Sequence, residues 1–341
     1  MKNPFVTNGY VSPEYFCDRE KETAKIVSLL TNENNIALIS PRRLGKTDLL
    51  RHCFGQPEIK EHYHTFIIDI YATSSVRDFV NVFGKAVLDE LRPKGKSVWG
   101  TFLNVLASLR SEITFDMNGQ PTWGIGLGAI TNPSATLDEI FSYLNNAGKP
   151  CLIAIDEFQQ ITKYADDPNI EAALRTHIQR CSNAHFVFSG SHRHLMGAMF
   201  TSPARPFYQS VTLINLPPIS VDKYAEFCLR HFERASKHLD TLVVTELYER
   251  FNGITSYMQK VMNILFSMTG TGEICIPSMI DTAINDLLDF SADTYDALLY
   301  QMPEKQRIVF MAIAAEGKAK AISSGDFVRK YKLQSASSVS S

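Results

Sequence analysis

Residues 40–47, Ser-Pro-Arg-Arg-Leu-Gly-Lys-Thr, have the residue types that hold phosphate groups in nucleotide-binding proteins. In such a loop, backbone N–H groups surround the phosphate oxygens, a lysine ammonium reaches the β- and γ-phosphates, and a hydroxyl ligates Mg²⁺. Lys46 and Thr47 would supply the ammonium and the hydroxyl, and a helix beginning near Asp48 would add the positive end of its dipole. We therefore expect a triphosphate site formed by Pro41, Arg42, Arg43, Leu44, Gly45, Lys46, Thr47 and Asp48.

The triplet Gly45-Lys46-Thr47 also arises by chance, and it could then be no more than a solvated turn before a helix. The apolar residues 36–39 directly before the loop favour a functional site, because they predict a buried strand that leads into it. Ser40 stands where the pattern usually begins with glycine, so the shape of the loop at this position is open.

Two carboxylates follow a second apolar run, residues 151–155, which has the composition of a buried parallel strand. Parallel strands present their carboxyl ends at one edge of the sheet, so Asp156 and Glu157 are expected to lie beside the phosphate loop. Asp156, together with Thr47, would hold Mg²⁺, and Glu157 would orient and deprotonate the attacking water. The alternative is a pair of exposed acids at the end of a strand.

A third apolar run, residues 185–188, leads into Ser189, Ser191 and Arg193. Either serine could contact the γ-phosphate or the attacking water, and Arg193 could stabilise phosphate charge. We therefore count Arg193 with Glu157 and Lys46 as candidate catalytic residues.

Four segments taken together resemble a known family. They are residues 16–20 (Phe-Cys-Asp-Arg-Glu), 41–47, 155–159 (Ile-Asp-Glu-Phe-Gln) and 189–196 (Ser-Gly-Ser-His-Arg-His-Leu-Met). In this order they resemble the archaeal-type ATPases, in the STAND branch of the AAA+ P-loop ATPases. The resemblance implies an ATPase core, a helical lid and a winged-helix domain that work as a nucleotide-controlled switch. It also implies that Arg19 lies near the bound base.

The chain departs from the family pattern at two further positions. Thr255 stands where the family has the proline of its lid motif, which puts the contact of the lid with nucleotide in doubt. Ser210 stands where relatives often have an arginine, so Arg193 or Arg205 would sense phosphate instead.

The whole chain predicts a doubly wound parallel α/β sheet of the P-loop type, with strands near 36–39, 65–71, 151–155, 185–189 and 211–216. We expect an ATPase core over residues 1–218, with a β-hairpin insertion near 95–135. A helical lid would follow over 219–292, and a winged-helix domain over 293–341. That last domain is expected to be truncated, because no wing follows the helix that opens at Ser335.

The composition fits a folded protein that needs no membrane. The net charge of −2 argues against a protein that coats nucleic acid through bulk charge. The six cysteines form no C-x-x-C pair, the first residues lack the apolar run of a signal peptide, and no apolar stretch is long enough to span a bilayer. We therefore expect reduced thiols and a cytoplasmic location.

These features predict an ATP-binding protein, with ATP or ADP and Mg²⁺ as cofactors, that hydrolyses ATP slowly and switches conformation with nucleotide state. No Asn-Lys-x-Asp sequence of the GTPase type is present, which favours ATP. Two alternatives stay open: an interaction module with little hydrolysis, or a DNA-binding regulator with an ATPase sensor domain. The partner could be a second copy or another protein, bound through the lid and winged helix, or DNA, because seven Lys/Arg against three acids occupy residues 303–332.

Overall fold

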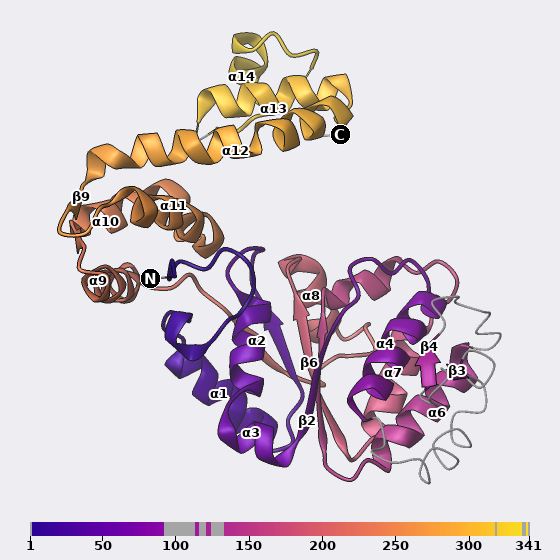
Figure 1. Ribbon diagram of the computed structural model, residues 1–341. Helices are drawn as coiled ribbons and strands as arrows, with labels where there is room; N and C mark the ends of the chain where they lie inside the picture. Colours follow the sequence, from indigo (N-terminus) through magenta and orange to yellow (C-terminus); the bar gives the residue numbers. More distant parts are fainter. Residues whose placement is uncertain are drawn as a thin grey trace. The chain divides into compact units, whose positions relative to one another are not determined.

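The computed structural model describes residues 2–91, 113–115, 121–123, 133–317, 319–335 and 339. The chain divides into two compact units, Met1–Pro277 and Ser278–Ser341, of which the first holds the sheet (Figure 1).

A five-stranded sheet forms the centre of the first unit, with every neighbouring pair of strands parallel. Its strand order is β2-β5-β6-β1-β7. Strands β1 and β5 are buried along their whole length, as their continuous apolar runs require. The predicted doubly wound parallel sheet is confirmed. The strands are β1 (Ile36–Ile39), β2 (His64–Asp69), β5 (Cys151–Asp156), β6 (Ala184–Gly190) and β7 (Thr212–Asn215).

Helices cover both faces of this sheet (Figure 1). Side chains alternate along each strand, so Ile36 and Leu38 of β1 pack on one face while Ala37 and Ile39 pack on the other. The first face is covered by α1 (Glu20–Thr31), α2 (Lys46–Phe54) and α3 (Pro57–His62). The second is covered by α4 (Val76–Glu90), α6 (Pro133–Asn145), α7 (Ile170–Arg180) and α8 (Arg193–Thr201).

The strand register brings the carboxyl ends of the strands level with one another. Ile39 at the end of β1 pairs with Gly190 at the end of β6, and Asp69 at the end of β2 pairs with Asp156 at the end of β5. The loops that follow β1, β2, β5 and β6 therefore leave from one edge of the sheet, where ligands bind in open α/β folds.

A helical lid follows β7 within the first unit. It consists of α9 (Val221–Arg234), α10 (Thr241–Phe251) and α11 (Thr255–Met268). The two short parallel strands β8 (His238–Leu239) and β9 (Ile274–Cys275) join the connection between α9 and α10 to the segment that follows α11.

The N-terminal strap, which we define as residues 3–19, packs on this lid. Phe5 is fully buried against the rings of Phe227, Phe232 and Phe266, with centroids 5.7–6.0 Å away. Asn3 donates to the backbone oxygen of Asn263 at 2.8 Å. The first residues of the chain are thus held by a helix more than two hundred residues later in the sequence.

His231 of α9 is a buried titratable group at this contact, near the exposed ion pair of Glu14 and Arg234. Its side chain is buried, its ring stacks on Tyr15 of the strap at 5.8 Å, and its Nε2 atom has no hydrogen-bond partner among the described residues. Burial lowers the pKa of His231 below its ordinary value of 6.5, and Arg230 and Arg234 lower it further. A hydrogen bond to the Glu14 backbone and the Glu14 carboxylate act in the opposite direction.

Acid is therefore expected to destabilise the packing of the strap on the lid. Because the pKa of His231 is lower in the folded chain, its contribution to stability is complete above pH 6.5 and is lost as the pH falls below that value. His231→Gln should reduce the slope of melting temperature against pH over roughly pH 7 to 5, measured by thermal unfolding. Equal slopes for the two proteins would contradict this assignment. Burial also lowers the pKa of His52, His177 and His185, which remain in both proteins.

The sheet domain also carries a short antiparallel pair of strands, β3 (Ile113–Phe115) and β4 (Pro121–Trp123). They lie within the segment expected to form a hairpin insertion. The residues that join these two strands lie outside the described part of the chain.

The second unit consists of α12 (Ile280–Gln301), α13 (Glu304–Glu316) and α14 (Gly325–Lys330). Ala312, Phe327 and Leu333 form its small core. The predicted boundary between lid and winged helix, at residues 292–293, falls inside the continuous helix α12. A helix can run from one domain into the next, so the boundary need not coincide with the end of a helix. The predicted domain limits therefore stay a prediction, and most of the helix expected after Ser335 lies outside the described residues.

No helix in the described part of the chain is both long and apolar enough to cross a membrane. All six cysteines are free and buried.

Candidate functional site

The loop that follows β1 closes around the position expected for phosphate. Ser40 is fully buried, its backbone N–H donates to the Gly190 oxygen at 3.3 Å, and its hydroxyl donates to the Pro41 oxygen at 3.0 Å. The left-handed conformations lie further on, at Arg43 (φ 69°) and Gly45 (φ 82°), and Ser40 is not among the residues with positive φ. The first position of the loop therefore needs a small side chain but not the conformational freedom of glycine.

Lys46 occupies the first position of α2 and lies against the loop. Its ammonium donates to the backbone oxygens of Ser40 at 3.3 Å and Pro41 at 3.4 Å. Burial lowers the pKa of Lys46, and the Asp156 and Glu157 carboxylates oppose that change. The side chain is only 7% exposed, so the ammonium is held in a buried position against the loop.

The end of β5 meets the start of α2 through a direct contact. The Thr47 hydroxyl donates to Asp156 Oδ2 at 2.5 Å, while Asp156 Oδ1 accepts from the Glu157 backbone N–H at 3.0 Å. Strand β2 ends one strand away at Asp69, whose carboxylate accepts from the Tyr71 backbone N–H at 2.8 Å. A hydroxyl and a carboxylate, both hard oxygen donors, are thus brought together beside Lys46.

Glu157 adopts the left-handed conformation, with φ 55°, directly before the short 3-10 helix η3 (Phe158–Lys163). Its Oε2 atom accepts from the Gln159 side-chain amide and, at 2.8 Å, from the Ser191 hydroxyl. Arg42 Nε donates to Ser191 Oγ at 3.4 Å, which connects the phosphate loop to this carboxylate. Left-handed residues other than glycine are uncommon and concentrate at functional sites.

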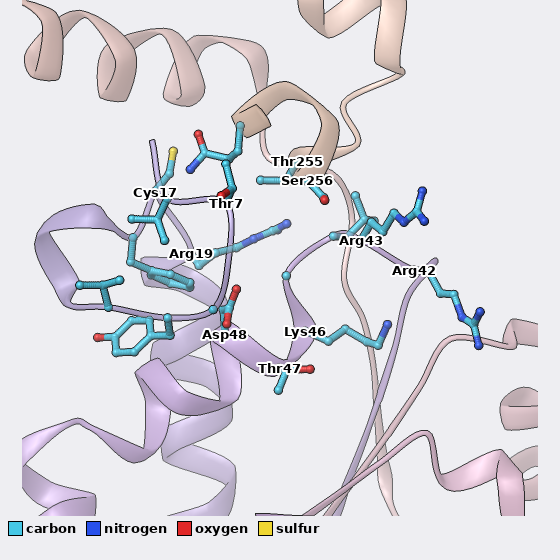
Figure 2. A pocket seen from close by; sticks show the side chains of 18 of the residues that line it. Thr7, Cys17, Arg19, Arg42, Arg43, Lys46, Thr47, Asp48, Thr255 and Ser256 are labelled. Atoms are coloured by element: carbon cyan, nitrogen blue, oxygen red, sulfur yellow. The ribbon is translucent and has the colours of Figure 1, made fainter. Parts of the chain in front are cut away.

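A cavity of about 650 Å³ lies over these groups, a volume typical of sites for small ligands. Its walls come from the strap, the phosphate loop, the ends of β2 and β5, and the start of α11. Figure 2 shows Arg19 on the strap side of this pocket and Lys46 and Thr47 at the start of α2.

The strap side of the cavity is rigidly built. Arg19 is 3% exposed and has φ 79°; it donates to the Pro217 oxygen at 2.7 Å and pairs with Glu22 at 3.0 Å. Phe16 stacks on the His52 ring of α2, with centroids 4.4 Å apart. This wall therefore links the segment before the lid to the helix that follows the phosphate loop.

Most of the residues expected at the site line the cavity, namely Arg19, Arg42, Arg43, Leu44, Gly45, Lys46, Thr47, Asp48, Asp156 and Glu157. The others lie elsewhere. Pro41 is not among the lining residues, Ser189 is fully buried in β6, and Arg193 is exposed at the start of α8. Arg205 pairs with Glu171 of α7. The functional roles of these residues stay predictions.

Several lining residues were not expected from the sequence. Asp69 is the last residue of β2, and Tyr71 follows the strand. A signal for Asp69 existed, since it ends an apolar strand just as Asp156 does. Ser256 and Gln259 come from α11. They carry no local signal, because only the folded chain brings the lid to the phosphate loop.

A family model described as "ATPase domain predominantly from Archaea" matches residues 16–261, and one described as "Probable winged helix domain" matches residues 293–341. A comparison with curated proteins finds no match.

Solved structures share the fold. The chain is similar to the Walker-type ATPase PABY2304 of Pyrococcus abyssi, with 18% identity and a TM-score of 0.61 over 96% of this chain and 87% of that one. It is also similar to the Aeropyrum pernix ORC2 protein in ADPNP-ADP complexes, with 14% identity and a TM-score of 0.60 over 97% and 82% of the two chains. For the Aeropyrum pernix ORC1 protein in complex with DNA, the identity is 14% and the TM-score 0.55 over 94% and 78%.

The neighbours show the P-loop ATPase fold, and the first family model spans most of the chain, from the strap through the phosphate loop to the lid. Together with the phosphate loop and the acidic end of β5, this match shows that the chain belongs to the family of ATPase domains found predominantly in Archaea.

Proposed function

We propose that this protein binds ATP with Mg²⁺, hydrolyses it slowly, and changes the position of its lid with nucleotide state. The observation that carries the proposal is the convergence of Lys46, Thr47, Asp156 and Glu157 at one edge of the sheet, under one cavity. Each residue has a part in phosphoryl transfer, which depends on positioning and charge neutralisation.

The phosphates would displace the contacts that Lys46 now makes. Its ammonium lies on the Ser40 and Pro41 oxygens through bonds of 3.3 and 3.4 Å, which are long for a charged donor. Phosphate oxygens are stronger acceptors, and the N–H groups at the start of α2 point to the same place. The base and ribose would occupy the strap side of the cavity, near Arg19.

The oxygen donors fit Mg²⁺. No group of three or more His, Cys, Asp or Glu side chains that could hold a metal ion by themselves occurs in the described part of the chain. Mg²⁺ in phosphoryl-transfer sites is usually bound by one or two carboxylates, with phosphate and water oxygens completing the octahedron. Thr47 and Asp156 supply that partial set. Bound there, the ion would neutralise charge on the β- and γ-phosphates.

The surroundings of Glu157 support a role in activating the attacking water. It follows Asp156 directly and lines the cavity, and its Oε1 atom has no hydrogen-bond donor among the described residues. We propose that Oε1 takes the proton of the attacking water.

Slow turnover follows from the arginines of the cavity. Arg19 is tied to Pro217 and Glu22. Arg42 donates to Ser191 and lies over the Tyr71 ring at 5.2 Å, and Arg43 lies over the Tyr257 ring at 4.9 Å, so each of these three arginines already has a partner. An arginine supplied by a second copy would then complete the site, and known arginine fingers contribute about 10³–10⁵ in rate.

Contacts between the phosphate loop and the lid support the switch. The Arg43 backbone oxygen accepts from the Ser256 N–H of α11 at 3.2 Å, and its guanidinium lies over the next residue, Tyr257. Any movement of the loop around phosphate therefore acts on α11. Protection of α11 from hydrogen exchange should differ between ATP and ADP; identical protection would refute the switch.

DNA binding by the winged helix is a second candidate. The family match over residues 293–341 and the basic excess of residues 303–332 favour it. Within the second unit Lys330 pairs with Glu316 at 2.6 Å and Arg329 with Asp326 at 2.5 Å, which reduces the free positive charge. Binding to duplex DNA that weakens with salt would support this function, and no binding at low salt would exclude it.

A further inference from the structure

The side chain of Glu157 is held on one oxygen only. Oε2 accepts from the Gln159 amide and from the Ser191 hydroxyl at 2.8 Å. Ser191 in turn accepts from Arg42 Nε at 3.4 Å. The hydroxyl has a single proton to donate, and a guanidinium donor on its oxygen strengthens that donation.

Gln159 reaches Glu157 because of two local features of the backbone. The left-handed conformation at Glu157 turns the chain sharply into η3, which places the Gln159 side chain back over the carboxylate. Gly190 provides the space for the amide. A Cβ atom at residue 190 would lie 2.4 Å from Gln159 Oε1 and 2.5 Å from Met196 Sδ.

The polar side chain of Gln159 is not explained by its contribution to the stability of the fold. Gln159 is 3% exposed, and its Oε1 atom is buried with no hydrogen-bond partner among the described residues. Burying an unpaired amide oxygen opposes folding, so an apolar residue of the same size would suit the position better. The contact that the amide does make is the one to Glu157.

We propose that Gln159 is a positioning residue, which together with Ser191 fixes Glu157 Oε2 and leaves Oε1 free for the attacking water. This inference rests on the proposed ATPase function. In the step, a water proton passes to Oε1, the oxygen bonds to the γ-phosphorus, and the bond from that phosphorus to the leaving ADP breaks. A carboxylate held on one oxygen keeps the other in the direction of attack.

Gln159→Met removes the donor and nearly conserves the volume of the side chain. It should lower kcat about tenfold while the Kd for ATP changes less than twofold, since Ser191 still holds the carboxylate. Ser191→Ala should have a similar effect, and the double variant should lose about 10²-fold. Gly190→Ala, which displaces the amide without altering residue 159, should reproduce the Gln159→Met result.

A double-mutant cycle separates positioning from a general structural role. In a Glu157→Gln background, Gln159→Met should cause no further loss of kcat, because there is no base left to orient. An equal loss in both backgrounds, or an increase in the Kd for ATP without a change in kcat, would overturn the proposal.

The four proteins of this cycle are the wild type, Gln159→Met, Glu157→Gln and the variant that carries both changes. They also distinguish failure of this inference from failure of the ATPase function. A wild-type chain that binds ATP but releases no phosphate would refute hydrolysis. In that case, melting temperatures test the contact between the Gln159 amide and the Glu157 carboxylate. Non-additive shifts for Gln159→Met and Glu157→Gln would support it, and additive shifts would overturn it.

Discussion

Glu157→Gln is expected to lower the kcat for ATP by about 10²–10⁴-fold while leaving the Kd for ATP–Mg²⁺ within about twofold of wild type. An amide has nearly the shape of a carboxylate and can still accept from Ser191 and Gln159, but it cannot take a proton from water. Phosphate release and equilibrium binding of a fluorescent ATP analogue measure the two quantities.

Glu58→Gln is the matched control for this variant. Glu58 is exposed on α3 and does not line the cavity, so the same chemical change there should leave kcat unchanged. If Glu157→Gln hydrolyses ATP as fast as this control, Glu157 is not the general base.

Asp156→Asn is expected to lower kcat by at least roughly 10²-fold and to raise the Mg²⁺ concentration needed for half-maximal activity. The Asp156 carboxylate, which accepts from the Thr47 hydroxyl at 2.5 Å, is the proposed Mg²⁺ ligand, and an amide binds Mg²⁺ much less strongly than a carboxylate. Titration of activity with Mg²⁺ measures both effects.

Asp69→Asn is the control that tests whether the effect of Asp156→Asn depends on the position of the carboxylate. Asp69 is the register partner of Asp156 and also lines the cavity, but its carboxylate is occupied by the Tyr71 N–H and does not contact Thr47. Because only Asp156 contacts the hydroxyl of Thr47, Asp69→Asn should shift the Mg²⁺ requirement less than Asp156→Asn. Equal shifts would mean that the metal is not held by Asp156 and Thr47 as proposed.

The sheet and its acidic edge could be predicted from the sequence because both signals are local. The apolar run at 151–155 requires burial on two faces, and its position before Asp156 and Glu157 fixes the end of the sheet to which they belong. The apolar run at residues 36–39 predicts in the same way the buried strand that leads into the phosphate loop. Strand limits shifted by only one or two residues, as for the run near 185–189, which extends over Ala184–Gly190.

The strap wall of the cavity could not be predicted in this way. Phe5 lies in a segment without helical or strand periodicity, and its partners on α9 and α11 follow more than two hundred residues later. Gln159 belongs to the segment 155–159 that carries the family resemblance, but nothing in the sequence indicated its role. Its place depends on the backbone turn at Glu157 and on the space left by Gly190, which only the folded chain brings together.

Ser40 shows why a departure from a motif need not mean loss of the site. The missing first glycine left the shape of the loop open, yet Ser40 has no positive φ and fits as a buried side chain bonded to Pro41. The left-handed turns that demand unusual residues lie at Arg43 and Gly45.

Binding and turnover of ATP–Mg²⁺, measured over a range of protein concentrations with Lys46→Ala as the control, test the central claim most directly. We expect binding that Lys46→Ala abolishes, because the buried ammonium at the mouth of the loop is lost. Turnover per chain should be slow and should rise with protein concentration, as an arginine from a second copy completes the site. Equal binding by the wild-type and Lys46→Ala proteins would contradict the claim that this loop holds the triphosphate.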